Sequence, residues 1–364
     1  VCYLVMQHNE EKWSENIFKI IKDIAMNHLN PEMDNPVITN ATDKEMYTAE
    51  MLMSNAINCV RGNATRTIGE LLWNDDALLN GFKDTINKLT LDENPAVQHA
   101  SLYALWPSYN IDRKWAMDHI IRLYQKDIRN VIFPDSNRML FYLYENYREE
   151  VLDVILNCIE SKDQKIIEVG AYILTEMYFQ KGEFIEVFEK INLISQKQAE
   201  SILSMTVQYF KIERYKEQAK ELILKFDVHS YDIELAITNL LYNNLINLNS
   251  DREFLHQVLQ SNISRKIAYV FSEYIEKSTE SIACFSSFIF DLSYSVINNS
   301  LNQPDALGAE DEISKLIIGL YDEVNGEPHM KEVAEECLEI WDLMFENFIR
   351  GVFAHELGHA LWLA

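Results

Sequence analysis

The sequence predicts an all-α fold built from consecutive pairs of helices. Apolar residues recur at the three- and four-residue spacing of an amphipathic helix; in residues 12–29, Trp13, Ile17, Ile20 and Ile24 share one face. The 364 residues include only 10 Gly and 7 Pro, which favours long regular helices over elaborate turns. Strict alternation of apolar and polar residues, the pattern of a β-strand, is almost absent. Hydrophobic residues make up 48% of the chain, enough to form a packed core.

The order of the predicted elements follows from short polar breaks between these amphipathic segments. Residues 30–44 and 298–311 are rich in Asn and contain Pro, so both are predicted loops. Further helices are predicted at 58–74, 77–89, 92–106, 115–124, 151–159, 163–178, 183–193, 198–210, 217–226, 232–245, 252–259, 264–276, 281–297, 312–324 and 328–349. We therefore predict a leading helix and loop at 1–45, repeats at 46–297, an acidic helical cap at 298–350 and a tail at 351–364.

Three of the predicted helices share a pattern of residue sizes. Each places an apolar residue, a small residue four positions later and a bulky aliphatic residue about four positions after that: Val60-Ala64-Ile68, Ala96-Ala100-Ala104/Leu105 and Ile166-Gly170-Leu174. Their starts are 36 and 70 residues apart, close to one and two units of about 35 residues. A small residue at the centre lets paired helices approach closely. The pattern is typical of a HEAT-like α-solenoid, and TPR-like pairs remain an alternative for the middle of the chain.

The formal net charge of −25 restricts the partners that we expect. Such a surface repels nucleic-acid phosphates and anionic membranes, so a protein with a basic or mixed surface is the predicted partner. No run approaches the roughly 20 apolar residues of a membrane helix. Residues 305–346 carry thirteen acidic and two basic side chains, either as a solvated face or as a docking surface for a basic partner. The five dispersed cysteines indicate buried thiols in a reducing, cytoplasmic location.

Aromatic residues are concentrated between positions 103 and 147. The run Phe141-Tyr142-Leu143-Tyr144 places bulky side chains on every side of one helix, so some of them must lie outside the core. Exposed Tyr and Trp side chains often contribute strongly to protein interfaces. The predicted partner-binding residues are Trp106, Tyr109, Phe141, Tyr142 and Tyr144.

The tail contains the HExxH motif of zinc peptidases. On a helix, His355 and His359 would lie on one face and could bind one zinc ion, with Glu356 as the general base. A working site needs a third ligand, and Trp362 stands where a similar motif in metzincin proteases has the Gly that turns the chain back toward the metal. We therefore favour no metal, no other cofactor and no catalytic residue. A zinc metallopeptidase is the alternative.

Two segments resemble a known class of protein regions. Residues 58–64 (NCVRGNA) followed by 68–72 (IGELL) resemble a helix of bacterial HEAT-type regions, and residues 335–342 (EECLEIWD) are similar to their last helix. Such regions form the C-terminal sensors of STAND-type NTPases of antiphage defence, and the resemblance covers roughly residues 46–350. It implies a bacterial cytoplasmic region that recognises a phage structural or packaging protein, such as the portal or terminase. It also implies that nucleotide binding belongs to modules outside this chain, through which the larger protein could form an oligomer.

Overall fold

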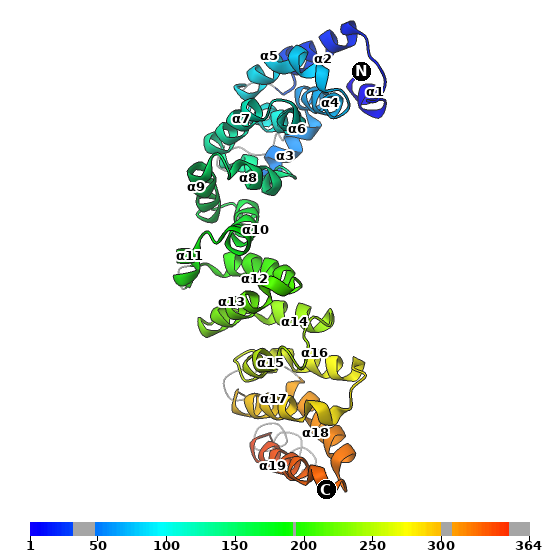
Figure 1. Cartoon of the computed structure of the whole chain (residues 1–364), viewed down its shortest axis with the longest axis vertical. Helices are drawn as coiled ribbons and strands as arrows, with labels where there is room; N and C mark the ends of the chain where they lie inside the picture. The colour runs from blue at the N-terminus through cyan, green and yellow to red at the C-terminus, as the bar shows by residue number, and fades with distance from the viewer. Residues whose placement is uncertain (32–47, 192–193, 300–307, 349–364) are drawn as a thin grey trace, which may run out of the picture. The chain divides into compact units, whose positions relative to one another are not determined.

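The computed structural model describes residues 1–31, 48–191, 194–299 and 308–348, and it is all-helical (Figure 1). Nineteen α-helices and several short 3-10 helices lie in these ranges, helix makes up 79% of the structure, and the described residues contain no strand. The prediction of an all-α fold is therefore confirmed. The structure divides into two compact units, Val1–Ile185 and Glu186–Ala364. This division does not test the boundaries predicted at residues 45, 297 and 350.

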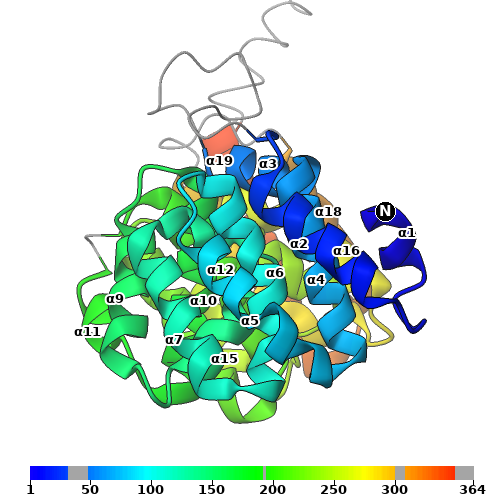
Figure 2. The ribbon, with the colours of Figure 1, turned by 90° about the horizontal axis from the view of Figure 1, so that it is seen from above.

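The first unit is built around α4 and α6, which pack closely against each other. The helix α2 packs on both α4 and α5, as Figure 2 shows from above. Two 3-10 helices, η2 (Asp76–Leu78) and η3 (Ile128–Ile132), lie between its α-helices. The α-helices are α1 (Cys2–Gln7), α2 (Glu15–Asn27), α3 (Ala49–Asn58), α4 (Val60–Asn74), α5 (Leu79–Thr90), α6 (Pro95–Ile111), α7 (Arg113–Lys126), α8 (Ser136–Leu143), α9 (Arg148–Ile159) and α10 (Gln164–Lys181).

Local sequence signals set several of these helix ends. Asn94 caps α6 by accepting a hydrogen bond from the Ala96 backbone N–H at 2.9 Å, and Pro95 occupies the first helical position, where no backbone donor is needed. We expected this helix to end at residue 106, but it continues through Pro107 to Ile111. Trp106, Pro107 and Ser108 are all buried, so tertiary packing outweighs the helix-breaking tendency of Pro107.

Small residues stand where helices approach most closely, as the sequence predicted. A Cβ atom built on Gly170 of α10 would lie 2.4 Å from the Cβ of Cys158 in α9, and Ala64 and Ala100 are fully buried. The close approach of α4 to α6 at Gly69 is one that we did not predict. A Cβ on Gly69 would lie 2.2 Å from the backbone oxygen of Tyr103 in α6, so only glycine fits there.

In the second unit each α-helix from α12 to α17 packs against the second α-helix after it. One series of contacts runs through α12, α14, α16 and α18, and another through α13, α15, α17 and α19. The α-helices are α11 (Ile185–Glu189), which spans the division between the units, α12 (Gln196–Phe210), α13 (Lys216–Val228), α14 (Glu234–Tyr242), α15 (Arg252–Leu259), α16 (Ser264–Lys277), α17 (Ser286–Asn299), α18 (Ala309–Val324) and α19 (Lys331–Phe348).

A buried ion-pair cluster joins α13 to the start of α15. Asp251 is 1% exposed, and its carboxylate lies 2.6 Å from Lys216 Nζ and 2.7 Å from Lys220 Nζ. Burial alone would raise the pKa of Asp251, but hydrogen bonds from the Asn247 backbone N–H and from the two lysines lower it. The carboxylate therefore stays charged and compensates two lysines at this junction.

The cysteines only partly follow the prediction of buried thiols. All five are free, and Cys59, Cys158 and Cys337 are buried, but Cys284 is exposed, so the prediction is wrong at that position. Burial raises the pKa of the Cys158 thiol to about 12. Across the part of the chain that the structure describes, no helix is long and apolar enough to cross a membrane.

Candidate functional site

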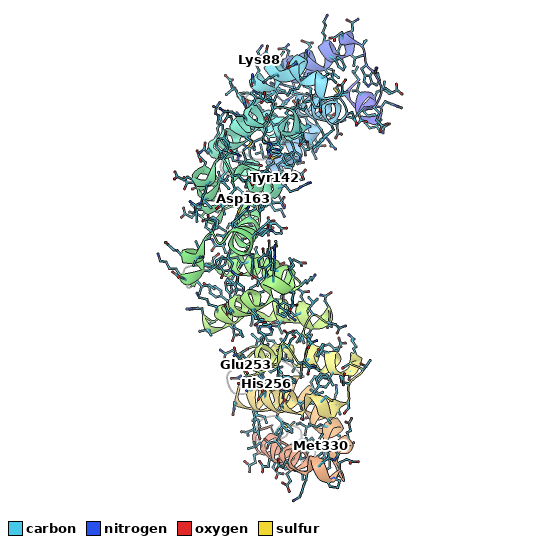
Figure 3. All side chains as sticks on the ribbon, in the orientation of Figure 1. Lys88, Tyr142, Asp163, Glu253, His256 and Met330 are labelled. Carbon is cyan, nitrogen blue, oxygen red and sulfur yellow. The ribbon has the colours of Figure 1, made fainter. Side chains whose placement is uncertain are left out.

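Three of the five predicted partner-binding residues form one cluster of aromatic rings in the first unit. Trp106 and Tyr109 lie three residues apart on α6 and therefore share a face, and Tyr142 reaches them from α8. The centroids of the Tyr142 ring and the Trp106 and Tyr109 rings lie 6.1 and 5.6 Å apart in stacked geometry, and Trp106 and Tyr109 are 5.7 Å apart. Trp106 is buried, whereas Tyr142 is 43% exposed and can be located in Figure 3. This aromatic cluster has a buried base and an exposed outer ring.

Two arginines lie over the aromatic cluster. The Arg113 guanidinium, at the start of α7, is 4.9 Å from the Tyr109 ring centroid, and that of Arg138 in α8 is 6.0 Å from the Trp106 centroid. Arg138 also forms an exposed ion pair with Asp135 at 3.4 Å. Cation–π contacts of this kind add modest stability at exposed sites. Their main effect here is to place positive charge beside an apolar surface on a strongly acidic chain.

Phe141 and Tyr144 belong to a different set of contacts. Lys181 of α10 lies 4.4 Å from the Phe141 ring centroid and 5.6 Å from that of Tyr144. The Tyr144 hydroxyl donates a hydrogen bond to Glu183, which also accepts two hydrogen bonds from the Arg148 Nη2 at 2.7 and 2.8 Å. Burial and the Glu183 hydrogen bond raise the pKa of Tyr144. These two residues therefore connect α8, α9 and the end of α10. Phe141 also meets the Tyr142 ring edge-on at a centroid distance of 6.3 Å, so it borders the aromatic cluster.

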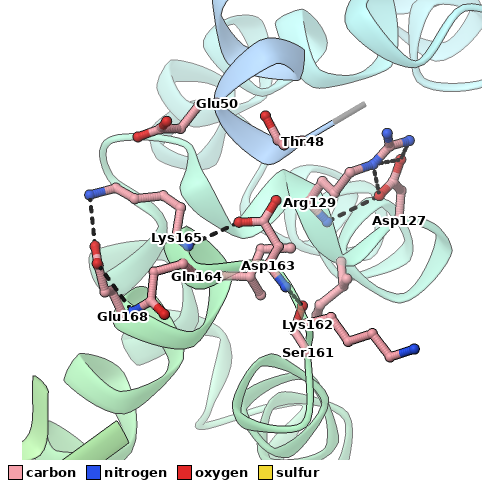
Figure 4. A pocket seen from close by; sticks show the side chains of 12 residues that line it. Thr48, Glu50, Asp127, Arg129, Ser161, Lys162, Asp163, Gln164, Lys165 and Glu168 are labelled. Carbon is pink, nitrogen blue, oxygen red and sulfur yellow. Dashed lines mark hydrogen bonds and ion pairs between the residues drawn. The ribbon is translucent and has the colours of Figure 1, made fainter. Parts of the chain in front are cut away.

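A separate pocket of about 710 Å³ lies where the N-termini of α3, η3 and α10 converge (Figure 4). Asp163 accepts hydrogen bonds from the backbone N–H groups of Ala49 at 2.8 Å and Lys165 at 2.9 Å, so one carboxylate caps both α3 and α10. Arg129 pairs with Asp127 at 2.6 Å, and Lys165 pairs with Glu168 at 3.2 Å. Because Asp163 caps two helices and two ion pairs neutralise four of the charged groups, we interpret the pocket as a junction between helices that are far apart in sequence.

The HExxH residues His355, Glu356 and His359 lie outside the described residues. Within residues 1–31, 48–191, 194–299 and 308–348, no group of three or more His, Cys, Asp or Glu side chains is arranged to hold a metal ion. The zinc site and the catalytic role of Glu356 stay predictions.

Comparisons with known proteins add no family to this picture. Neither the models of known protein families, nor the curated proteins, nor the solved structures include a match to this chain.

Proposed function

We propose that the chain is a protein-recognition scaffold: a solenoid of HEAT/TPR-like helical pairs whose aromatic cluster binds a protein partner. The observation that carries the proposal is the exposed Tyr142 ring, stacked on Trp106 and Tyr109 at 6.1 and 5.6 Å. The repeat architecture is supported by the second unit, where α12, α14, α16 and α18 form one series of contacts and α13, α15, α17 and α19 form the other. Such alternation is expected of stacked helical pairs.

The physical case for binding rests on rigidity and composition. Tyr and Trp are enriched among interface residues whose truncation costs 2 kcal/mol or more. Neighbouring rings already hold Tyr142, so a partner that covers it orders little additional structure. Arg113 and Arg138 beside the rings add donors for carboxylates or carbonyl oxygens of the partner. An extended or helical protein segment with an apolar side chain and an acceptor group suits this surface.

The finer part of the proposal rests on the resemblance of residues 58–72 and 335–342 to bacterial HEAT-type regions. By that resemblance the chain is the ligand-sensing region of a larger antiviral STAND NTPase, and its partner is a phage structural or packaging protein. Binding would then be relayed to the nucleotide-binding and effector modules of that larger protein.

Biolayer interferometry on the purified chain tests both parts of the proposal, with purified phage portal proteins and large terminase subunits as analytes. A partner that binds the wild type should bind the Tyr142→Ala variant at least about tenfold more weakly, a loss of about 1.4 kcal/mol. Tyr269→Ala is the matched control, because Tyr269 is 55% exposed and lies on α16, outside the aromatic cluster. Equal affinity of both variants would remove the cluster from the interface, and binding by none of the phage proteins would contradict the sensor role.

A further inference from the structure

A second surface of the first unit, distinct from the aromatic cluster, lies between α5 and α7. It is a cleft of about 470 Å³ that combines apolar and cationic side chains. Its lining residues are Asn87, Thr90, Leu91, Trp115, His119, Arg122, Leu123 and Lys126. We call this the α5–α7 cleft. Leu91, at its rim, is 75% exposed and adds apolar surface to the opening of the cleft.

The cationic character of the cleft comes from one face of α7. Trp115, His119, Arg122 and Lys126 follow one another at steps of four, three and four residues, so they form a single stripe along that helix. The Nδ1 atom of His119 is hydrogen-bonded to the Trp115 backbone oxygen at 2.7 Å, which leaves Nε2 for another partner. Arg122 and Lys126 are exposed, and neither forms an ion pair with another described residue. This stripe is positive on a chain whose net charge is −25.

The helix α19 carries a complementary surface. Its buried face consists of Cys337, Ile340 and Met344. A second stripe, with the same steps of four, three and four residues as on α7, is apolar and partly exposed: Ala334, Leu338, Trp341 and Phe345, of which Phe345 is 63% exposed. A third stripe beside it is acidic and exposed, and consists of Glu335, Glu339, Asp342 and Glu346. In the described part of the chain, Glu339, Asp342 and Glu346 form no ion pair.

We propose that α19 of one molecule docks in the α5–α7 cleft of a second molecule of this chain. Seven residues separate His119 from Lys126 and Glu339 from Glu346, about 10.5 Å along a helix in both cases. Two helices packed side by side can therefore place three carboxylates opposite His119, Arg122 and Lys126. The same contact covers Trp341 and Phe345 of α19 with the exposed Leu91 and the Trp115 ring.

Two physical points define the resulting assembly. Whole molecules with a charge of −25 repel each other, but at 0.15 M salt the Debye length is about 8 Å, so charges within the contact dominate. The two surfaces differ, so the contact is heterologous and builds rings or short chains rather than a two-fold dimer. The inference is independent of the phage partner proposed above, because it uses neither the aromatic cluster nor the resemblance.

Paired charge reversals in the full chain test the docking. The cleft variant is Arg122→Glu/Lys126→Glu, and the helix variant is Glu339→Lys/Glu346→Lys. The control Lys12→Glu/Lys19→Glu changes the net charge by the same amount as the cleft variant. Both lysines are exposed, and neither lines the cleft. Sedimentation equilibrium at 0.15 M salt, over protein concentrations from about 1 to 100 μM, measures the weight-average mass of each protein and of an equimolar mixture of the cleft and helix variants.

The expected result is a wild-type mass that rises with concentration, a similar rise for the control, and dissociation constants at least about tenfold weaker for each reversed variant alone. The mixture should recover association, because each reversed surface then meets its opposite charge. A wild type that stays monomeric across this range would overturn the proposal. A mixture that stays as dissociated as each variant alone would also overturn it. That second outcome is expected if α19 contacts its own chain or another protein.

Discussion

The packing of α4 against α6 gives the most direct quantitative prediction, the effect of Gly69→Ala. The added Cβ would lie 2.2 Å from the Tyr103 backbone oxygen and 2.7 Å from its carbonyl carbon. Backbone atoms cannot rotate away as a flexible side chain can, so the two helices must separate locally by roughly 1 Å. Gly69 lies inside α4 (Val60–Asn74), and Ile68 and Leu71 on either side of it are buried as well.

Two opposing terms set the size of the effect. Alanine is favoured over glycine inside a helix by about 1 kcal/mol. Overpacking against an immovable neighbour costs about 3 kcal/mol, the upper part of the usual range. We therefore expect Gly69→Ala to lower the free energy of unfolding by about 2 kcal/mol, which for a unit of this size corresponds to a decrease in Tm of about 4–8 °C.

Thermal and urea denaturation followed by circular dichroism measure this change. Gly81→Ala is the matched control in the same unit, because the nearest atom to its added Cβ is the flexible Lys22 Nζ at 3.9 Å. The control should be neutral or stabilising by up to about 1 kcal/mol. If Gly69→Ala were as stable as Gly81→Ala, the close approach of α4 and α6 would not exist in solution, and the reasoning from Gly69 would be refuted.

Three further predictions follow from buried groups. Burial lowers the pKa of His99 to about 4, below its unfolded value of about 6.5. The free energy of unfolding should therefore be highest above pH 6.5 and fall by about 3 kcal/mol as the pH falls from 6.5 to 4. His99→Gln should flatten this dependence in urea denaturation at a series of pH values. Asp251→Asn removes the partner of Lys216 and leaves the buried Lys220 paired only with the exposed Glu217, so it should cost about 3 kcal/mol by urea denaturation; a loss below 1 kcal/mol would show that the cluster is hydrated. Maleimide labelling of the native chain should modify Cys284 and spare Cys158, and rapid labelling of Cys158 would contradict its burial.

The sequence predicted the helices because the signal for a helix is local. The apolar residues three and four positions apart express constraints within one helix. The small residue at Gly170 expresses a constraint between a helix and its immediate neighbour. The same reasoning missed α3 (Ala49–Asn58), which directly precedes α4 and is separated from it by a single residue, Cys59. The predicted helix begins at residue 58, so no helix was predicted over residues 49–57, where α3 lies.

The candidate site was predictable only in part. The excess of bulky residues in the run from Phe141 to Tyr144 showed that some side chain must lie outside the core, and Tyr142 is that side chain. The separate role of Tyr144 depends on Glu183, which is 39 residues away, and no local pattern indicates that contact. The stripe from Trp115 to Lys126 is visible in the sequence, but the cleft forms only where α5 and the residue after it, Leu91, pack beside α7.

The sequence by itself therefore determined the helices, their amphipathic faces and the small residues at their contacts, because these depend on residues within a few turns of one another. Only the tertiary structure decided which aromatic rings stack on α6 and α8, how Asp163 caps a helix 114 residues away, and where the α5–α7 cleft opens. The physical reason is that such contacts depend on how helices distant in sequence pack together, and many residues contribute weakly to that packing.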